Sequence, residues 1–587
     1  MKQFFKFMFA SMLGFFLTSL LLIFFLFGMI ASLGKKEQVK VEPNTVLHLT
    51  LTTEIIDRAS DNPFESFDFI SGTPSRAIGL NDLLRNIRKA KETENIKGIF
   101  LDVTAVQAGW ASLREIREAL EDFKTSEKFI LAYSDVMTQG AYYLATVADE
   151  ILINPEGGVD FRGLNAEVMF LKRMLEKIGV DAQVIRHGKF KSAGEPFFLE
   201  KLSAENRIQI EAYVGSLWNT TLKDIADSRN MTINRLNEIA DGFITRTPQG
   251  ALEAGMIDGI AYRDEVMDNL RNRLGLEENK KVSLITYSRF QNAPLPESML
   301  PMRARDKVAV IYGQGNIIMG EGGDRSMGAD RIAAALRKAR EDESVKAIVF
   351  RINSGGGSAL ASEIMLREAM LAAEAKPLIV SMGDVAASGG YYVAAYADKI
   401  IANPNTITGS IGVFGMIPNM KELFNDKLGI TFDNVKTNQL ADLASVNRPL
   451  NRLEREIIQS EIERVYDTFL HHVSEGRNLP LAAVDSIAQG RVWSGVDAKR
   501  IGLIDEFGGL QFAIAQAAEM AELETYRVVE YPVQKDFFTR LREGFSEVET
   551  RIIRKRLGES YRIYESMQQA TENTGILMRM PFDMDIQ

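Results

Sequence analysis

Cysteine is absent from the sequence, and histidine occurs only four times in 587 residues. Without cysteine the chain can form no disulfide, no thiolate metal site and no cysteine nucleophile. The histidines are His48, His187, His471 and His472, and the last two are adjacent instead of four residues apart on a helix. The sequence therefore predicts no helical histidine metal site and no cofactor.

An excess of positive charge is missing as well. Lysine and arginine number 69 against 79 aspartate and glutamate residues, which gives a formal net charge of −10. Proteins that bind nucleic acid neutralise phosphates with lysine and arginine, so we predict no nucleic-acid partner. The chain is 46% hydrophobic and 25% charged, which is typical of globular proteins. Its length predicts two or more domains.

Residues 7–34 contain no charge at all, and this run of 28 residues is dense in Phe and Leu. About 20 apolar residues suffice to cross a bilayer as a helix. A cleaved signal peptide is the alternative, and Ala31 and Ser32 leave it open. Its apolar core would span only about 7–15 residues, so the length favours a retained anchor within residues 1–40 that contacts membrane lipid. Lysines flank both ends of the run, so the charge count does not set the orientation.

The strongest internal feature is a duplication. The segment GLNDLLRNIRKAKETENIKGIFLDV, ending at Val103, aligns with GADRIAAALRKAREDESVKAIVFRI, ending at Ile352. The same offset aligns DVMTQGAYYLATVADEILINP with DVAASGGYYVAAYADKIIANP. Self-similarity of this kind indicates two homologous units. The predicted parts after the anchor are an N-terminal repeat at 41–290, a proline-containing linker at 291–305, a C-terminal repeat at 306–532 and a charged helical tail at 533–587.

Each repeat alternates short hydrophobic runs with helical patterns. Residues 346–352 (KAIVFRI) and 377–382 (PLIVSM) are typical of buried parallel strands, whereas 329–340 and 362–375 have helical spacing. The alternation predicts βαβ units and an α/β fold in each repeat. In such sheets, functional sites lie at the carboxyl ends of the strands.

One such strand end carries a serine. The segment DVAASGG follows the strand at 377–382, and it places Ser388 where a helix is expected to begin at Gly389 and Gly390. The preceding strand is followed by NSGGGS at 353–358, and a glycine-rich turn can point backbone N–H groups at an anion. A plain tight turn is the alternative for that loop alone. Together the two segments predict a serine nucleophile beside an oxyanion hole.

A serine nucleophile needs a base. No histidine lies beside a strand end of the C-terminal repeat, so lysine is the alternative. The N-terminal repeat contains HGKFKSAGEPF at 187–197, where Lys191 aligns with Leu440 or Ala441 of the other repeat. Because one repeat keeps the serine and the other keeps the lysine, we predict one shared site with Ser388 and Lys191 as a dyad. Burial must then lower the lysine pKa toward about 7–8.

The motifs INSGGGS, DVAASGGYY, TGSIGVFG and GKFKSAGEPF, spread over two repeats behind an apolar N-terminus, resemble the long, duplicated form of the bacterial signal peptide peptidase A (protease IV) family. The resemblance implies a fold related to the Clp protease and crotonase superfamily and a homotetramer. It also implies an inner-membrane anchor with the catalytic part in the periplasm. The implied activity is a Ser-Lys serine peptidase that degrades remnant signal peptides and other apolar peptides.

The resemblance assigns roles to particular residues. It implies Ser388 as nucleophile, Lys191 as base with Lys189 as second choice, Ser410 as a hydroxyl that hydrogen-bonds the lysine amine, and the backbone N–H groups of Gly389 and Gly357 as oxyanion donors. The N-terminal repeat has Phe161 at the position of Ser410. Gly355 replaces a proline common in the family, and we expect the donors to survive at an entropic cost that lowers activity.

Two other functions fit part of the pattern. A crotonase-like acyl-CoA enzyme would use the glycine loop on a thioester carbonyl without Ser388 or Lys191. A catalytically silent membrane scaffold would use the same loop for packing alone. For a peptidase, we expect small or aliphatic side chains beside the scissile bond. The tail at 533–587 is expected to be a packing or assembly helix, with binding to lipid headgroups as the alternative.

Overall fold

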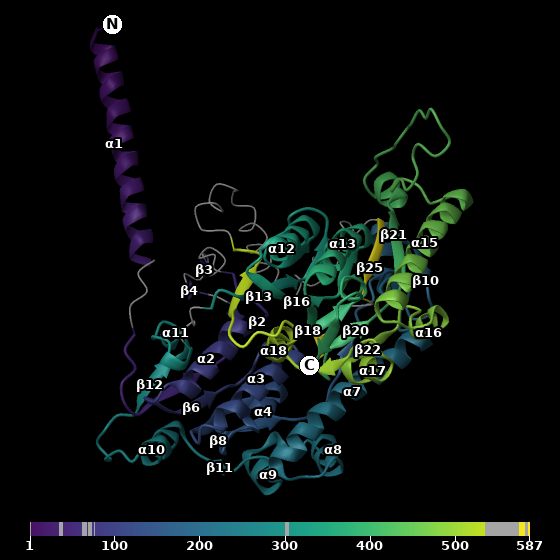
Figure 1. Cartoon of the computed structure of the whole chain (residues 1–587). Coiled ribbons are helices and arrows are strands. Elements are labelled where there is room, and N and C mark those ends of the chain that lie inside the picture. Colours follow the sequence, from purple (N-terminus) through teal and green to yellow (C-terminus); the bar gives the residue numbers. More distant parts are fainter. Residues whose placement is uncertain are drawn as a thin grey trace.

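The computed structural model describes residues 2–33, 39–60, 67–68, 73–74, 77–299, 304–534, 575–580 and 585–586. Over these residues helices alternate with mostly parallel strands, which confirms the predicted α/β fold. Figure 1 shows an N-terminal body in purple and blue beneath a C-terminal body in teal and green.

The N-terminal body is built on a six-stranded sheet. In spatial order, its strands are β11 (Gly259–Ile260), β8 (Glu150–Asp160), β7 (Phe129–Thr138), β6 (Ile96–Asp102), β1 (Thr45–Leu49) and β12 (Ser283–Thr286). All neighbouring strands run parallel. Helices α2 (Leu80–Glu92) and α3 (Trp110–Lys124) pack their buried side chains on one face, and α10 (Arg263–Arg273) packs on the other. Helices therefore cover both faces, as parallel sheets require.

The C-terminal body has an eight-stranded sheet. Its strands are β22 (Val492–Ser494), β20 (Ile407–Gly409), β18 (Leu378–Ala387), β16 (Val345–Ser354), β13 (Lys307–Gln314) and β24 (Arg527–Tyr531), with β19 (Lys399–Ala402) beside β18 and β23 (Glu506–Phe507) beside β19. Helices α12 (Ala329–Glu341) and α13 (Ala359–Ala375) cover one face, and α18 (Leu510–Met520) covers the other. The strands and helices predicted for this repeat are confirmed.

The two sheets share one order of strands. The series β12-β1-β6-β7-β8-β11 corresponds to β24-β13-β16-β18-β19-β23. The strands β7 and β18 carry the two aligned DV segments, so the duplication seen in the sequence is also a duplication of topology. The exact boundaries of the repeats and the linker stay a prediction.

A third sheet joins the two repeats. Its order is β10 (Asp181–His187), β21 (Val413–Asn419), β25 (Gly575–Arg579), β17 (Gly356–Ser358), β14 (Asn316–Ile318) and β15 (Ser326–Gly328). β10 comes from the N-terminal repeat and pairs antiparallel with β21 of the C-terminal repeat. Two long helices, α7 (Ala204–Arg229) and α15 (Arg452–Gly476), flank this junction.

The tail was predicted to be helical, and this is wrong for Gly575–Arg579, which is a strand. The reason is long-range pairing, because β25 completes hydrogen-bonded ladders with β17 on one side and β21 on the other. Two strand edges outweigh a local helical preference over so few residues. The charged stretch on which the helical prediction mostly rested, residues 535–574, lies outside the described residues.

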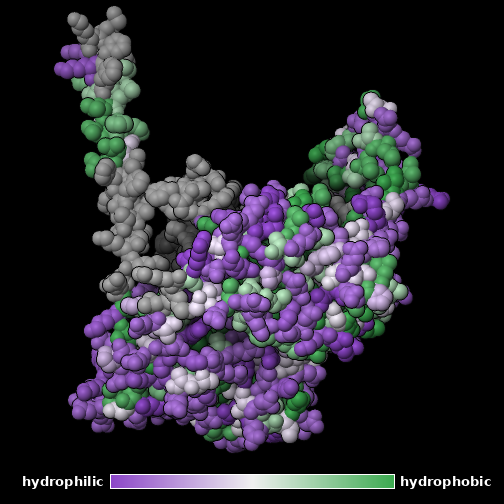
Figure 2. Space-filling model, viewed as in Figure 1, coloured by the Kyte–Doolittle hydropathy of each residue, from purple (hydrophilic) through white to green (hydrophobic). Residues whose placement is uncertain are grey.

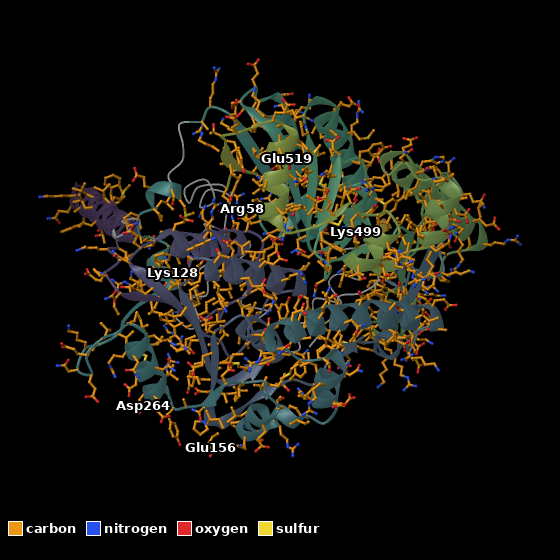
Figure 3. All side chains as sticks on the ribbon, turned by 60° about the horizontal axis from the view of Figure 1, so that its bottom comes forward. Arg58, Lys128, Glu156, Asp264, Lys499 and Glu519 are labelled. Atoms are coloured by element: carbon orange, nitrogen blue, oxygen red, sulfur yellow. The ribbon has the colours of Figure 1, made fainter. Side chains whose placement is uncertain are left out.

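Charged side chains also join the two bodies. Figure 3 labels Lys128 and Glu156 on the N-terminal body, Lys499 and Glu519 on the C-terminal body, and Arg58 where the two meet. Arg58 Nη1 donates to the Pro532 carbonyl at 2.7 Å. The buried Arg351 guanidinium of the C-terminal body donates to Asp57 and Glu115 of the other body, at 2.7 Å each. Breaking one partner of such a buried pair is costly, so these contacts fix how the repeats are placed.

The N-terminus begins with a 32-residue helix, α1 (Lys2–Leu33), which extends away from the body in Figure 1. Figure 2 shows mostly green, hydrophobic atoms on the coloured middle part of this helix, and a mixture of green and purple atoms on the projection at the upper right. Leu428, Ile430 and Phe432, in the segment after β21, are exposed. Across the described part of the chain, no helix reaches the length and hydropathy of a membrane span. The membrane anchor stays a prediction.

The remaining elements are short. They are β2 (Ile55–Ile56), β3 (Phe67–Asp68), β4 (Thr73–Pro74), β5 (Ile78–Gly79), α4 (Gln139–Ala145), β9 (Ala166–Glu167), α5 (Lys172–Ile178), α6 (Glu195–Phe198), α8 (Ile233–Asp241), η1 (Ile244–Arg246), α9 (Pro248–Glu253), α11 (Tyr287–Phe290), η2 (Glu297–Met299), α14 (Gly389–Tyr392), η3 (Leu423–Lys427), α16 (Leu481–Ile487), α17 (Gly495–Arg500) and β26 (Asp585–Ile586).

Candidate active site

The structure brings together three residues that the sequence singled out. Lys191 Nζ lies 2.8 Å from Ser388 Oγ. The same nitrogen lies 3.1 Å from the carbonyl oxygen and 3.1 Å from Oγ of Ser410. All three residues are fully buried. One amine from the N-terminal repeat therefore meets two hydroxyls from the C-terminal repeat.

Burial decides the protonation state of this amine. It lowers the pKa of Lys191 well below the ordinary value of 10.5. An uncharged amine has two N–H donors and one lone pair. The Ser410 carbonyl can only accept, and the Ser410 hydroxyl can accept the second N–H, which leaves the lone pair for the Ser388 hydroxyl. The arrangement suits Lys191 as the acceptor of the Ser388 proton.

Ser388 lies in a sharp turn between β18 and α14. Its φ of 55° and ψ of −116° fall in a region that favours glycine. The turn is held on both sides, since the Ser388 N–H donates to the Gly409 carbonyl at 2.8 Å and the Ser388 carbonyl accepts from the Tyr392 N–H at 2.8 Å. A serine in such a conformation costs about 1–3 kcal/mol. The turn directs the hydroxyl toward Lys191.

Two glycines of the C-terminal repeat allow the Lys191 side chain to approach. A Cβ at Gly490, whose φ is 76°, would lie 2.5 Å from Lys191 Cβ. A Cβ at Gly412 would lie 3.2 Å from Lys191 Cδ. The Phe190 N–H also donates to the Gln489 carbonyl at 2.9 Å. The sequence analysis missed both glycines, although Gly412 lies in the TGSIGVFG motif.

The loop around Lys191 is held by the half-buried Arg186 and by buried polar side chains. Arg186 Nη1 donates to the Lys191 carbonyl at 3.0 Å and to the buried Glu195 carboxylate at 3.2 Å. Gln209 of α7 donates to Ser192 Oγ at 2.9 Å. The sequence analysis assigned no role to these side chains. Glu195 stands inside the GKFKSAGEPF motif, and the single carboxylate in a segment with two lysines was the available signal.

The predicted oxyanion donors lie on two elements. Gly389 is the first residue of α14, where a backbone N–H has no acceptor within the helix. Gly357 lies in β17, where it pairs with Ile317 and with Met578. The donor roles of Gly389 and Gly357 stay predictions. At Gly355, an added Cβ would meet the Met580 side chain at 3.5 Å, an ordinary contact, so the position does not require glycine for space.

The competing bases lie elsewhere. Lys189, the second choice, is exposed. His48 hydrogen-bonds Asp102 at 2.8 Å, and His187 stacks on Tyr466 with ring centroids 4.1 Å apart. Lys191, whose amine contacts Ser388, therefore fits the role of the base better than Lys189, His48 or His187.

A serine hydroxyl within hydrogen-bonding distance of a buried amine, at the end of a parallel strand, is typical of serine hydrolases. Comparison with known proteins shows which family of serine hydrolases this chain belongs to. The model of peptidase family S49 matches residues 122–277 and 371–524, one segment in each repeat. The chain belongs to peptidase family S49 and is a serine peptidase.

Relatives match over most of the chain. "Protease 4" of Haemophilus influenzae is 38% identical over 454 residues, covering 76% of this chain and 73% of the relative. "Protease 4" of Salmonella typhi is 36% identical over 77% of this chain and 74% of its own. "Serine protease SPPA, chloroplastic" of Arabidopsis thaliana is 34% identical over 82% and 70%. The predicted resemblance to this family is confirmed.

Among solved structures, the "ClpP1 N165D mutant from Listeria monocytogenes" aligns with 35% of this chain and 94% of its own, at 15% identity and a TM-score of 0.24. The predicted relation to the Clp protease and crotonase fold stays a prediction.

Proposed function

We propose that the protein is a membrane-anchored endopeptidase in which Ser388 is the nucleophile and Lys191 is the general base. The observation that carries this proposal is the 2.8 Å contact between the buried Lys191 amine and the Ser388 hydroxyl. Burial lowers the pKa of the Lys191 amine well below its ordinary value, and this favours the uncharged form that a general base requires. The family match to peptidases supplies the substrate class, a peptide bond.

The reaction then follows from these groups. Lys191 Nζ removes the proton as Ser388 Oγ attacks the peptide carbonyl, and the resulting ammonium gives that proton to the leaving amine. The amine departs and leaves an acyl ester on Ser388. Water enters, loses a proton to Lys191 and attacks the ester; as the acid is released, the Lys191 ammonium returns that proton to Ser388 Oγ, which restores the serine hydroxyl and the uncharged amine. Throughout, Ser410 keeps the amine turned toward Ser388 through its two contacts.

The developing oxyanion is proposed to be bound by backbone N–H groups of Gly389 and Gly357. Support comes from their position, since Gly389 follows the nucleophile directly and Gly357 lies in the neighbouring strand β17. Each such donor is worth about 3–4 kcal/mol of transition-state stabilisation in serine peptidases.

The substrates are proposed to be remnant signal peptides and other apolar peptides. The support is the resemblance of the motifs and the uncharged run at residues 7–34, which we propose anchors the chain in the bacterial inner membrane with its catalytic part in the periplasm. We propose also the Clp-like fold relation and the homotetramer implied by the family. The repeat at 41–290 would supply the lysine, and the repeat at 306–532 the serine.

Covalent labelling tests the dyad. A fluorophosphonate probe should label Ser388 in the native protein, and Lys191→Ala should label at least about 100-fold more slowly. Lys189→Ala, an exposed lysine two residues away, is the matched control and should label at the native rate. Thermal melting of each variant separates loss of the base from loss of the fold. Equal labelling of a folded Lys191→Ala would refute the dyad, and hydrolysis of acyl-CoA esters by a folded Ser388→Ala would favour the crotonase-like alternative.

A further inference from the structure

The C-terminal segment of the chain occupies a position beside the proposed dyad. β25 pairs antiparallel with β17 through Gly357 and Met578, and with β21 through Phe414 and Leu577. Figure 1 shows β25, in yellow, beside β21. β17 carries the proposed oxyanion donor Gly357, and β21 begins three residues after Ser410. The segment therefore fills the space between the two strands that flank the site.

The main chain of this segment runs against the glycine loop. The Met580 N–H donates to the Gly355 carbonyl at 2.5 Å. The Met578 carbonyl oxygen lies 2.1 Å from the place that a Cβ on Gly356 would take, and 3.0 Å from the corresponding place on Gly389. Contacts this close require glycine at positions 356 and 389. The segment thus packs against the backbone next to Ser388, the proposed nucleophile.

Two side chains of the segment enter separate apolar clusters. Leu577 is 5% exposed and packs in a cluster with Ala193 and Phe414, and Ala193 is two residues after Lys191. Met580 is 8% exposed and packs in a cluster with Ala387, the residue before Ser388. One cluster therefore borders the proposed base and the other borders the proposed nucleophile.

Backbone ladders combined with side-chain pockets are how extended peptides are recognised at sheet edges. A peptide substrate that lay along β17 or β21 would need the same main-chain groups that β25 now uses. We propose that residues 575–580 are a built-in competitive inhibitor, bound in the groove of the peptide substrate, which must leave before a peptide is cleaved. This inference rests on the proposed function, because it takes the groove beside Ser388 as the peptide site.

The mode of inhibition has a kinetic signature. A tethered segment acts at an effective concentration of about millimolar, and it reduces the fraction of enzyme that is open. The apparent affinity for substrate falls by that fraction, whereas the bound complex reacts at its normal rate. The segment should therefore raise KM and leave kcat unchanged. An exclusively structural role for β25 would instead lower kcat or stability when the segment is disturbed.

The test uses the full-length protein with the double substitution Leu577→Lys and Met580→Lys, which places charges in the two apolar clusters. The matched control is Val533→Lys, a valine that is 66% exposed and lies outside the groove. With a short apolar peptide ester, we expect the double variant to show at least a tenfold lower KM at unchanged kcat, and the control to match the native enzyme. Fluorophosphonate labelling of Ser388 should accelerate by the same factor.

A synthetic Gly-Ile-Leu-Met-Arg-Met peptide provides the converse measurement. It should inhibit the double variant competitively and inhibit the native enzyme much less, because the native groove is already filled. A folded double variant with unchanged or higher KM, or non-competitive inhibition by the peptide, would overturn the proposal. Ser388→Ala added to the double variant separates the role of Ser388 from the role of residues 575–580. Activity that survives this change refutes Ser388 as the nucleophile, whereas the inhibitory role of the segment is judged from the KM of the double variant alone.

Discussion

The two repeats end their equivalent strands β7 and β18 in opposite ways. In the N-terminal repeat, Gln139 begins α4, and its Oε1 accepts from the N–H groups of Arg162 at 3.2 Å and Gly163 at 3.0 Å. In the C-terminal repeat, Ser388 takes the same position with a positive φ, and its hydroxyl faces Lys191. The Gln139 side chain accepts hydrogen bonds from the backbone of the loop, whereas the Ser388 hydroxyl lies against the Lys191 amine and is the proposed nucleophile.

The positions of Ser410 and Phe161 repeat this contrast. Phe161 is fully buried, and its ring lies 6.0 Å from that of Tyr142 and 5.3 Å from that of Trp218. The N-terminal repeat has therefore replaced a polar site by apolar core. The C-terminal repeat keeps two strained serines, with φ of 55° at Ser388 and 50° at Ser410, and receives its base from the other repeat. Strain persists where the proposed chemistry requires it.

The largest difference between the two repeats should appear on removing the aligned side chains. Ser388→Ala should lower kcat/KM at least about 1,000-fold, because the nucleophile is gone. Gln139→Ala should leave kcat/KM within about twofold, and it should lower the free energy of unfolding by about 1 kcal/mol, because it removes hydrogen bonds to the loop. Steady-state kinetics and urea unfolding measure both. Equal losses of activity from the two substitutions would contradict the division of roles.

A second comparison uses a pair of aligned glycines. Gly490→Ala would bring a Cβ to 2.5 Å from Lys191 Cβ, so the amine must move away from Ser388. We expect kcat to fall about 10–100-fold, as is typical when a catalytic group is displaced by about an ångström. Gly242 ends the segment IADG at 239–242, which aligns with IAQG at 487–490, so it is the counterpart of Gly490 in the N-terminal repeat. A Cβ at Gly242 would lie 3.2 Å from the Glu238 carbonyl oxygen and far from the proposed site, so this position serves as the control. Gly242→Ala should retain native kcat, and a native kcat for Gly490→Ala would show that the Lys191 side chain is not held by this contact.

The lowered pKa of Lys191 also predicts a pH dependence of stability. Between the folded pKa and the ordinary 10.5, the unfolded chain holds a proton on this lysine that the folded chain lacks. The free energy of unfolding should therefore rise with pH in that window by about 1.4 kcal/mol per unit, relative to Lys191→Met. Urea unfolding at several pH values gives this difference. A constant difference between the two proteins would mean that Lys191 is charged in the folded state.

The smallest expected effect concerns strain. Ser388→Gly should be more stable than Ser388→Ala by about 1–2 kcal/mol, because glycine adopts the positive φ at that turn without a Cβ clash. Gln139→Gly should be less stable than Gln139→Ala by up to about 1 kcal/mol, since that residue starts a helix. Opposite signs at the two aligned positions are the prediction, and a loss of stability for Ser388→Gly relative to Ser388→Ala would refute the strain at the nucleophile.

Much of the fold could be predicted from local patterns. The strands at 346–352 and 377–382 became β16 and β18 because hydrophobic runs of that length, alternating with helical periods, have few other arrangements. The contact between Ser388 and Lys191 could also be predicted by comparing the repeats, because the C-terminal repeat has the serine without the lysine and the N-terminal repeat has the lysine without the serine.

Other features depend on distant parts of the chain and left little local trace. β25 is a strand because it meets two edges that are more than 150 residues away in sequence, β17 and β21. Gly490 matters because Lys191 approaches it from the other repeat. The roles of Arg186 and Gln209 arise likewise from where the loop and α7 come together. Such contacts are set by the assembled fold and not by local preference.

In the proposed mechanism, an uncharged Lys191 amine takes the proton of Ser388. The pH dependence of kcat/KM for a short peptide ester reports on this proton transfer. Because only the uncharged amine accepts a proton, kcat/KM should rise with pH through a single ionisation and reach its plateau well below pH 10.5, and this ionisation should vanish from the residual activity of Lys191→Met. The same ionisation persisting in Lys191→Met, or a rise that continues to pH 10.5 in the native enzyme, would rule out Lys191 as the base.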